Sequence, residues 1–436
     1  MKVGTNISSI YMGNKKQKSK EIIIVENTKY LIIFAYIMFI LLSSFLFNTP
    51  RDIIMGMKKI ILSPSILLTD YMKLANIGSA LFNSSLLMLI SLIIARINKI
   101  SMKGPVIAAI FTIGGFGLFG KNIYNIWAIF LGVYLYSFIQ GDKFNKYIIT
   151  AFFGTALGPL VSQISFGLGL KPFAGILLGN LGGLIVGIIL PPLASHFFGF
   201  HKGYNLYNLG FTAGIVGTLF MSLLRGFGFE NNSTLIVLEG KNLILSIYFF
   251  IYFVSMILVG WLINGQNFKG YKALLKDSGR ATSDFISQYG FSISLINMGI
   301  LGILSISYIL LVKGQLSGLV IGGVFTVVGF GAFGKHPKNT IPIVVGVYIA
   351  SIFKVWKINS AGILLAALFG TTLAPISGTF GWKAGILAGF LHVSIVSNTG
   401  YLHGGMNLYN NGFAGGIVAA ILVPVMESFR KGTINK

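Results

Sequence analysis

The chain contains no cysteine, which excludes disulfide bonds, thiolate metal sites and cysteine nucleophiles from its 436 residues. Acidic residues are scarce as well: 10 Asp and Glu stand against 33 Lys and Arg, and charged residues make up only 10% of the chain. Because soluble domains carry about 25% charged residues, this composition cannot cover a surface that faces water. The outside of the protein must therefore face lipid.

Long apolar runs support a membrane location. Residues 30–47 contain no charge over 18 positions, and residues 243–263 form a longer uncharged run. Each run is long enough for a helix that crosses a bilayer. No small-residue cleavage site follows the first run, so it is not a removable signal peptide. The expected fold class is an all-α polytopic membrane protein.

The chain repeats itself. Phe111–Lys121 (FTIGGFGLFGK) recurs at Phe325–Lys335 (FTVVGFGAFGK), with 8 of 11 positions identical and an offset of 214. His201–Gly217 recurs at His403–Ala419, with 11 of 17 positions identical. Three further pairs share the first offset: Asp70 with Asp284, Asn83 with Asn297, and Asn125 with Asn339. Because the blocks keep their order, the chain is predicted to consist of two homologous halves.

The expected segments are a basic cytoplasmic amino-terminal segment (1–28), a first transmembrane repeat (29–225), a connecting polar loop (226–242), a second transmembrane repeat (243–426) and a short basic carboxy-terminal tail (427–436). Six lysines precede the first apolar run, which predicts a cytoplasmic amino terminus. Residues 48–70 then lie outside. Their counterparts in the second half carry Lys269, Lys272 and Lys276 and are predicted to be cytoplasmic. Equivalent loops on opposite sides indicate an inverted repeat with an odd number of crossings per half.

Each half also contains apolar segments that are too short to span a bilayer. Val106–Phe119 and Leu319–Phe333 end in the glycine-rich block, whereas Ile148–Leu157 and Ile363–Leu373 are shorter still and stop at a proline. Segments of this length indicate re-entrant or broken helices. Four or five full spans per half are expected besides them.

The block HxGxNLYNxGF supplies most of the candidate substrate-binding residues, which are Asn205, Tyr207, Asn208, Asn407, Tyr409 and Asn410. Asparagines three positions apart are predicted to share one helix face. Their carboxamides either contact a polar solute or cap a helix start and tie helices together. His201 and His403, at the edge of this helix, either relay protons and gate with pH or lie at head-group level.

Lys121 and Lys335 end the block GFGxFGK. Its exposed backbone amides and its lysine can bind an anion or take part in gating a solute path. The alternative is a tight hairpin with the lysine at the membrane interface. A nucleotide-binding loop is excluded, because GxxxxGK[ST] is absent here.

Two more pairs are candidates. Thr155 and Thr371 lie in the block FGTxLxP. Its proline leaves backbone carbonyls unbonded, and these carbonyls and the threonine hydroxyls can contact a substrate or a cation. The alternative is that the block only packs helices together. Asp70 and Asp284 either bind a coupling ion or cap a helix. No metal site, no catalytic residue and no cofactor are expected.

The paired blocks GFGxFGK and HxGxNLYNxGF resemble an uncharacterised family of bacterial multi-pass membrane proteins, domain of unknown function 1576, over nearly the whole chain. The resemblance implies a bacterial cytoplasmic membrane and names no substrate. The element Gly203–Asn205 is also loosely similar to a glycine–aromatic–asparagine element of urea transporters, which are inverted repeats too. Their LPxxTxPF motif is absent here.

These patterns predict transport of a small polar or anionic solute at the interface of two repeats, by a secondary transporter or a channel-like facilitator. The alternative is a membrane-embedded binding or sensor subunit. No enzyme is expected, because HExxH and GxSxG are absent. Expected partners are anionic lipid head groups at the basic loops and a small-molecule or ion substrate. No nucleic acid is expected, and a homo-oligomer remains open.

Overall fold

The computed structural model describes residues 24–231 and 234–434, and most of the basic amino-terminal segment lies outside this range. Within the described residues the regular elements are all helical, joined by turns and two isolated β-bridges. Nine described segments are long and apolar enough to cross a membrane, five in the first half and four in the second. The prediction of an all-α polytopic membrane protein is confirmed.

The first repeat is built from α1 (Glu26–Phe47), α2 (Pro50–Ile61), α3 (Tyr71–Leu74), α4 (Ile77–Ile97), α5 (Gly104–Phe116), α6 (Trp127–Ile139), the 3₁₀ turn η1 (Phe144–Lys146), α7 (Ile148–Gly154), the 3₁₀ turn η2 (Thr155–Leu157), α8 (Gly158–Ser162), the π-helical turn η3 (Gln163–Gly167), α9 (Pro172–His201) and α10 (Asn208–Gly226). The second repeat contains α11 (Asn242–Ile263), α12 (Tyr271–Leu274), α13 (Phe285–Tyr289), α14 (Phe291–Leu311), α15 (Gly318–Phe330), α16 (Pro337–Phe353), α17 (Ala361–Gly370), the 3₁₀ turn η4 (Thr371–Leu373), α18 (Ala374–Phe380), α19 (Trp382–Thr399) and α20 (Asn410–Ile434). Because α20 runs to Ile434, most of the expected tail is helical.

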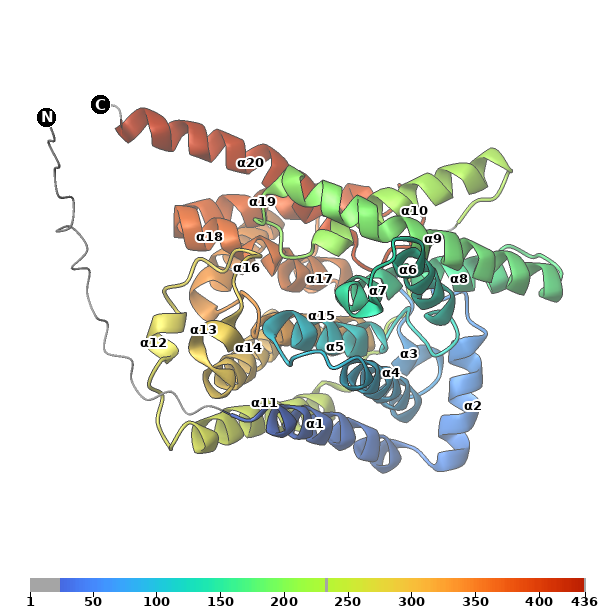
Figure 1. Cartoon of the computed structure of the whole chain (residues 1–436), viewed down its shortest axis with the longest axis horizontal. Coiled ribbons are helices and arrows are strands. Elements are labelled where there is room, and N and C mark those ends of the chain that lie inside the picture. Colours follow the sequence, from blue (N-terminus) through green and yellow to red (C-terminus); the bar gives the residue numbers. More distant parts are fainter. Residues whose placement is uncertain (1–23, 232–233, 435–436) are drawn as a thin grey trace, which may run out of the picture.

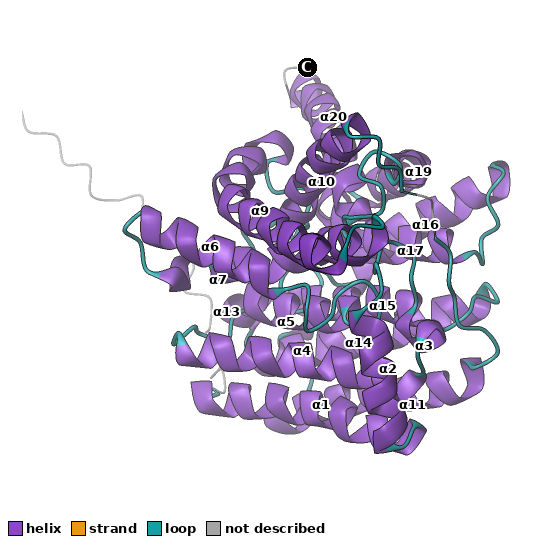
Figure 2. Ribbon diagram, turned by 90° about the vertical axis from the view of Figure 1, so that its right-hand side faces the viewer, coloured by secondary structure: helices purple, strands orange, loops and turns teal. Residues whose placement is uncertain are grey.

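Equivalent helices pair across a pseudo-two-fold axis. In Figure 1, α1 and α11 lie at the bottom, α5 and α15 in the centre, and α10 and α20 at the top. Equivalent aromatic residues touch in each pair: the ring centroids are 5.4 Å apart for Tyr36–Tyr252, 6.1 Å for Phe111–Phe325 and 5.1 Å for Tyr207–Tyr409. A residue can contact its own equivalent only beside a symmetry axis, so the axis passes through all three pairs. Figure 2 shows the same order of pairs from the side.

The central pair, α5 and α15, runs antiparallel with the backbones in contact. A Cβ added at Gly104, where α5 begins, would lie 2.3 Å from the carbonyl oxygen of Ala332, just beyond the end of α15. A Cβ at Gly115 would lie 2.5 Å from the carbonyl oxygen of Gly322, and one at Gly322 would lie 2.5 Å from that of Gly115. Small residues permit such close packing of helices.

The two repeats are inverted with respect to each other. The segment that joins the first two spans of the first repeat contains α2 and α3, at the right in Figure 1. Its counterpart in the second repeat contains α12 and α13, at the left. Equivalent connections therefore lie at opposite ends of the helices, as predicted.

The proline-containing segments are broken helices, which was one of the two predicted forms, but they are longer than predicted. Ile148–Gly167 and Ala361–Phe380 do not stop at Pro159 and Pro375, and each continues as one broken span of 20 residues. A 3₁₀ turn precedes each proline, which then occupies the first turn of α8 or α18. A helix continues there because the missing N–H of proline forfeits no hydrogen bond in a first turn.

Candidate substrate site between the repeats

Lys121 and Lys335 lie inside the protein, and both are 0% exposed. The alternative that placed them at the membrane interface is therefore wrong. The Asn83 amide donates 2.8 Å to the carbonyl of Lys121, and the Asn297 amide donates 2.7 Å to that of Lys335. Each amide also donates to a glycine carbonyl of the same turn. These bonds fix the glycine-rich turn after α5 and after α15, and the lysine side chain points inward.

The Lys335 half-site is closed by its own hydrogen bonds. The Lys335 Nζ donates to Tyr207 Oη at 2.5 Å and to Thr371 Oγ1 at 2.7 Å. It also lies 4.5 Å from the centroid of the Tyr207 ring. The Thr371 hydroxyl in turn donates to the carbonyl of Leu368. Residues of both repeats build this half-site, because Tyr207 belongs to the first and Lys335 to the second.

The equivalent Lys121 half-site is open. The Lys121 Nζ makes one long contact, 3.4 Å to the carbonyl of Phe152, which already accepts a 2.7 Å bond from Thr155 Oγ1. The hydroxyl of Tyr409, the equivalent of Tyr207, has no hydrogen-bond partner among the described residues. Lysine, tyrosine and threonine therefore occur in both half-sites. Their side chains are hydrogen-bonded to one another around Lys335 but not around Lys121.

The asparagines beside these tyrosines differ in the same way. The Asn205 amide donates 3.0 Å to the carbonyl of Gly412, and Asn205 Oδ1 accepts 2.5 Å from Thr372 Oγ1. Its counterpart Asn407 has an unpartnered Nδ2 in the described structure. Alanine stands at position 156, opposite Thr372, so the first half lacks that hydroxyl. Sequence analysis did not single out Thr372, and only this one-residue difference between the repeats points to it.

The asparagines three positions apart do not share a helix face, and that prediction is wrong. Asn205 precedes α10, whereas Asn208 is its first residue. The Asn205 side chain accepts a bond from the N–H of Tyr207, a local turn that delays the helix start. The Asn407 side chain accepts one from Tyr409 in the second repeat.

Asn208, Asn410 and the two histidines connect neighbouring helices. His201 and Asn208 share a 2.9 Å hydrogen bond, as do His403 and Asn410. The two amides also donate to carbonyls of the preceding helices, at Ala194 and Val396. This bonding is typical of residues that tie helices together. Burial lowers the pKa of the His403 imidazole to about 4, which weighs against gating by this histidine near neutral pH.

A cluster of four phenylalanines surrounds the tyrosine pair: Phe116, Phe153, Phe330 and Phe369. The Phe116 ring lies 4.7 Å from that of Tyr409, and the Phe330 ring lies 4.7 Å from that of Tyr207. Lys121 Nζ lies 5.3 Å from the centroid of Phe116. These phenylalanines lie in the repeated blocks but were not among the predicted site residues. Their recurrence in both halves is the signal that the sequence contains for them.

Two cavities flank this cluster at opposite ends of the molecule. The first has a volume of about 660 Å³ and is lined by Leu67 and Thr234, near α3 and the loop after α10. The second has a volume of about 140 Å³ and is lined by Ala281, near α13. Lining positions of the large and the small cavity are equivalent in the two repeats: Leu67 and Ala281, Phe119 and Phe333, Leu365 and Ile149, Phe369 and Phe153, Leu408 and Leu206, Asn410 and Asn208. One cavity is thus present twice; its wide copy has the larger volume and its narrow copy the smaller one.

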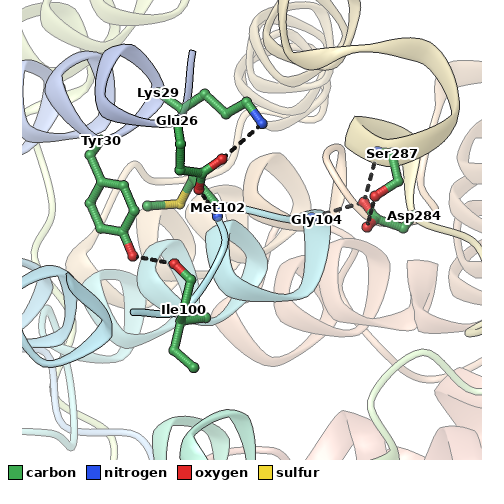
Figure 3. A network of polar contacts seen from close by, with 8 residues as sticks. All are labelled: Glu26, Lys29, Tyr30, Ile100, Met102, Gly104, Asp284 and Ser287. Carbon is green, nitrogen blue, oxygen red and sulfur yellow. Dashed lines mark hydrogen bonds and ion pairs between the residues drawn. The ribbon is translucent and has the colours of Figure 1, made fainter. Parts of the chain in front are cut away.

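The two matched acids cap helices, which was one of the two predicted roles. Asp70 accepts bonds of 2.8 Å from the N–H of Met72 in α3 and 3.1 Å from that of Gly318, the first residue of α15. Asp284 accepts from α13 and, at 2.9 Å, from the N–H of Gly104, the first residue of α5 (Figure 3). Each carboxylate caps one helix in each repeat.

Comparison with protein families gives one match. The model described as a protein of unknown function (DUF1576) matches residues 49–226 and 263–428, one region in each repeat. Comparisons with curated proteins and with solved structures give no match.

Proposed function

The chain belongs to the DUF1576 family, whose members have no known function, and we propose that it carries a small polar or anionic solute across a membrane by alternating access. The unequal pair of equivalent cavities, 660 Å³ and 140 Å³, carries this proposal. When two inverted repeats exchange their conformations, the wide cavity closes and the narrow one opens at the opposite end. Each end then has access to the same central site in turn.

A channel-like facilitator is the alternative, and it needs a continuous polar path. The aromatic cluster between the two cavities argues against such a path. The rings of Phe116 and Phe369 stack with centroids 5.8 Å apart, and Tyr207 and Tyr409 are in contact beside them. All four side chains are buried. This packing favours a carrier, in which the cluster rearranges, over an open pore.

The orientation is part of the proposal. We place the protein in the bacterial cytoplasmic membrane with its amino terminus in the cytoplasm. The described chain starts at the end of the molecule that carries α12 and α13 (Figure 1). The narrow cavity then faces the cytoplasm, and the wide cavity opens to the outside.

Cysteine accessibility tests the mechanism, and the chain needs no background mutations because it contains no cysteine. The variant Leu67→Cys probes the wide cavity, and Ala281→Cys probes the equivalent position of the narrow one; both side chains are half-buried. In proteoliposomes, we expect a small membrane-impermeant thiol reagent to modify the Leu67→Cys variant from one side. The Ala281→Cys variant should react more slowly, and only from the other side.

Cross-linking in the double variant decides between the alternatives. A reagent that bridges the wide cavity from the cysteine at position 67 should further slow modification at position 281 and stop solute exchange. Simultaneous, independent access to both cysteines with uninterrupted flux would favour the facilitator. Fixed accessibility together with the absence of any flux would favour the binding or sensor subunit.

A further inference from the structure

We propose that the solute is a small, singly charged anion, held in this conformation by Lys121 and Tyr409 and, after the repeats exchange, by Lys335 and Tyr207. The inference deepens the proposed function, because it assigns a substrate class to the same central site. It rests on the hydrogen-bond inventory of the two half-sites.

The open half-site has unused donors. In its protonated form Lys121 has three N–H groups, and its one contact, the 3.4 Å bond to the carbonyl of Phe152, leaves two of them without an acceptor. Asn407 Nδ2, also a donor, has no partner in the described structure. The Asn407 oxygen already accepts from the N–H of Tyr409. The hydroxyls of Tyr409 and Thr112 lie next to each other, and neither forms a hydrogen bond within the described structure. A surplus of donors requires a ligand rich in acceptors.

Charge points the same way. Neither Lys121 nor Lys335 forms an ion pair with a described residue. The buried carboxylate of Asp70 is occupied by backbone N–H groups. Burial lowers the pKa of both lysines, because the charged form is costly without a counter-charge. An anion would supply that charge and the missing acceptors at Lys121. One free lysine balances one negative charge, so the proposed solute is singly charged.

The closed half-site shows how the lysine is satisfied without an anion. Lys335 reaches the hydroxyls of Tyr207 and Thr371, and those bonds occupy the place of a ligand. Thr372, which has no counterpart hydroxyl at Ala156, adds a bond to Asn205 on this side only. In this conformation, therefore, Lys335 is held by one residue from each repeat, and Lys121 is available.

Tyr409, together with Tyr207, lines the narrow cavity. The wide cavity reaches the aromatic cluster beside Lys121 but is not lined by Lys121 itself. Phe369 lines this cavity and stacks on Phe116, whose ring lies 5.3 Å from Lys121 Nζ. The same Phe369 ring lies 6.4 Å from that of Tyr409. Aromatic ring edges carry a partial positive charge, which suits a partly dehydrated anion passing between them.

Formate and formamide form a decisive pair of probes, because they have nearly the same size and differ in charge. The purified full-length protein is titrated with sodium formate or formamide, with sodium gluconate balancing the ionic strength, and thermal unfolding is followed. A ligand that binds the folded state raises its melting temperature. We expect formate to raise it in a saturable way and formamide to leave it unchanged. Equal shifts with both solutes, or none with formate, would overturn the anion assignment.

The two lysines provide matched variants. Lys121→Met should abolish the formate-dependent shift, whereas Lys335→Met should keep it and lose formate flux in proteoliposomes. Because a lysine variant can fail to fold, Tyr409→Phe serves as a milder test that removes one hydroxyl. Loss of a hydrogen bond to a charged ligand should weaken formate binding about tenfold or more. Unchanged binding in both Lys121→Met and Tyr409→Phe would contradict the site.

The outcomes separate this inference from the proposed function. Flux of a neutral solute with no formate binding would overturn the anion site and leave alternating access intact. Formate binding that depends on Lys121, without flux of any solute, would support the anion site and overturn transport.

Discussion

Asp284 and Gly104 lie 180 positions apart in the chain, and a 2.9 Å hydrogen bond joins the carboxylate of one to the backbone N–H of the other. Asp70 and Gly318 form the equivalent 3.1 Å bond at the opposite end of the molecule. A Cβ at Gly318 would lie 2.4 Å from Asp70 Oδ1, so a glycine is needed there for the close approach. The two acids therefore connect the repeats where α5 and α15 begin.

These caps should differ in strength. Asp70 is 0% exposed and also accepts from Leu238, so Asp70→Ala leaves several buried N–H groups unsatisfied. We expect a loss of about 3 kcal/mol or more in the free energy of unfolding. Asp284 is partly exposed, and Asp284→Ala should cost about 1 kcal/mol. Unfolding in detergent measures both, with Glu239→Ala at an exposed loop position as the control that should leave stability nearly unchanged. Equal losses for Asp70→Ala and Glu239→Ala would contradict the capping role.

Asp70 also predicts a pH dependence. Burial raises the pKa of its carboxyl from 3.8 to about 6, against the opposing effect of the backbone hydrogen bonds. The folded protein then binds a proton that the unfolded chain releases, so this contribution stabilises the fold below about pH 4 and fades as the pH rises to about 6. The difference in stability between wild type and Asp70→Asn should change over this window and be flat above it. Parallel curves from pH 4 to 8 would show that the carboxyl does not titrate there.

The contact between α5 and α15 predicts a glycine that cannot be replaced. A Cβ at Gly115 meets the Gly322 backbone, which cannot move aside as a flexible side chain would. Gly115→Ala should therefore destabilise the protein by about 1–3 kcal/mol. Gly199 in α9 has open space around it, and Gly199→Ala should instead stabilise by up to about 1 kcal/mol. Thermal unfolding of both variants checks the opposite signs.

The repeat, its inversion and the acid caps could be predicted from the sequence, because each leaves a local or periodic signal that appears twice. Burial of Lys121 and Lys335 could not be predicted, since a lysine after a glycine-rich turn can face the interface or the interior. Only the packing against the other repeat decides whether the lysine lies at the interface or in the interior. The start of α10 at Asn208 was missed because one side-chain bond from Asn205 overrides the helical spacing.

The unequal bonding of the half-sites could not be predicted either. Thr155 and Thr371 lie in almost identical blocks, yet only Thr371 accepts a bond from its lysine in this structure. The pair of half-sites can be read from the repeated blocks. Which half-site is hydrogen-bonded and which is open depends on the packing of the two repeats against each other, and this packing leaves no signal in the nearly identical blocks.

The inversion of the repeats predicts from which side of the membrane cysteines at two surface positions react with a thiol reagent. Lys58 in α2 and Lys272 in α12 occupy equivalent positions at the offset of 214; both are exposed, and their helices lie at opposite ends of the molecule (Figure 1). In sealed membranes, a membrane-impermeant thiol reagent should modify Lys58→Cys from one side only and Lys272→Cys from the other side only. A cytoplasmic amino terminus places position 272 in the cytoplasm, because basic connecting segments stay inside. Labelling of both cysteines from the same side would contradict the inverted arrangement, and a swap of the two sides would contradict only the orientation.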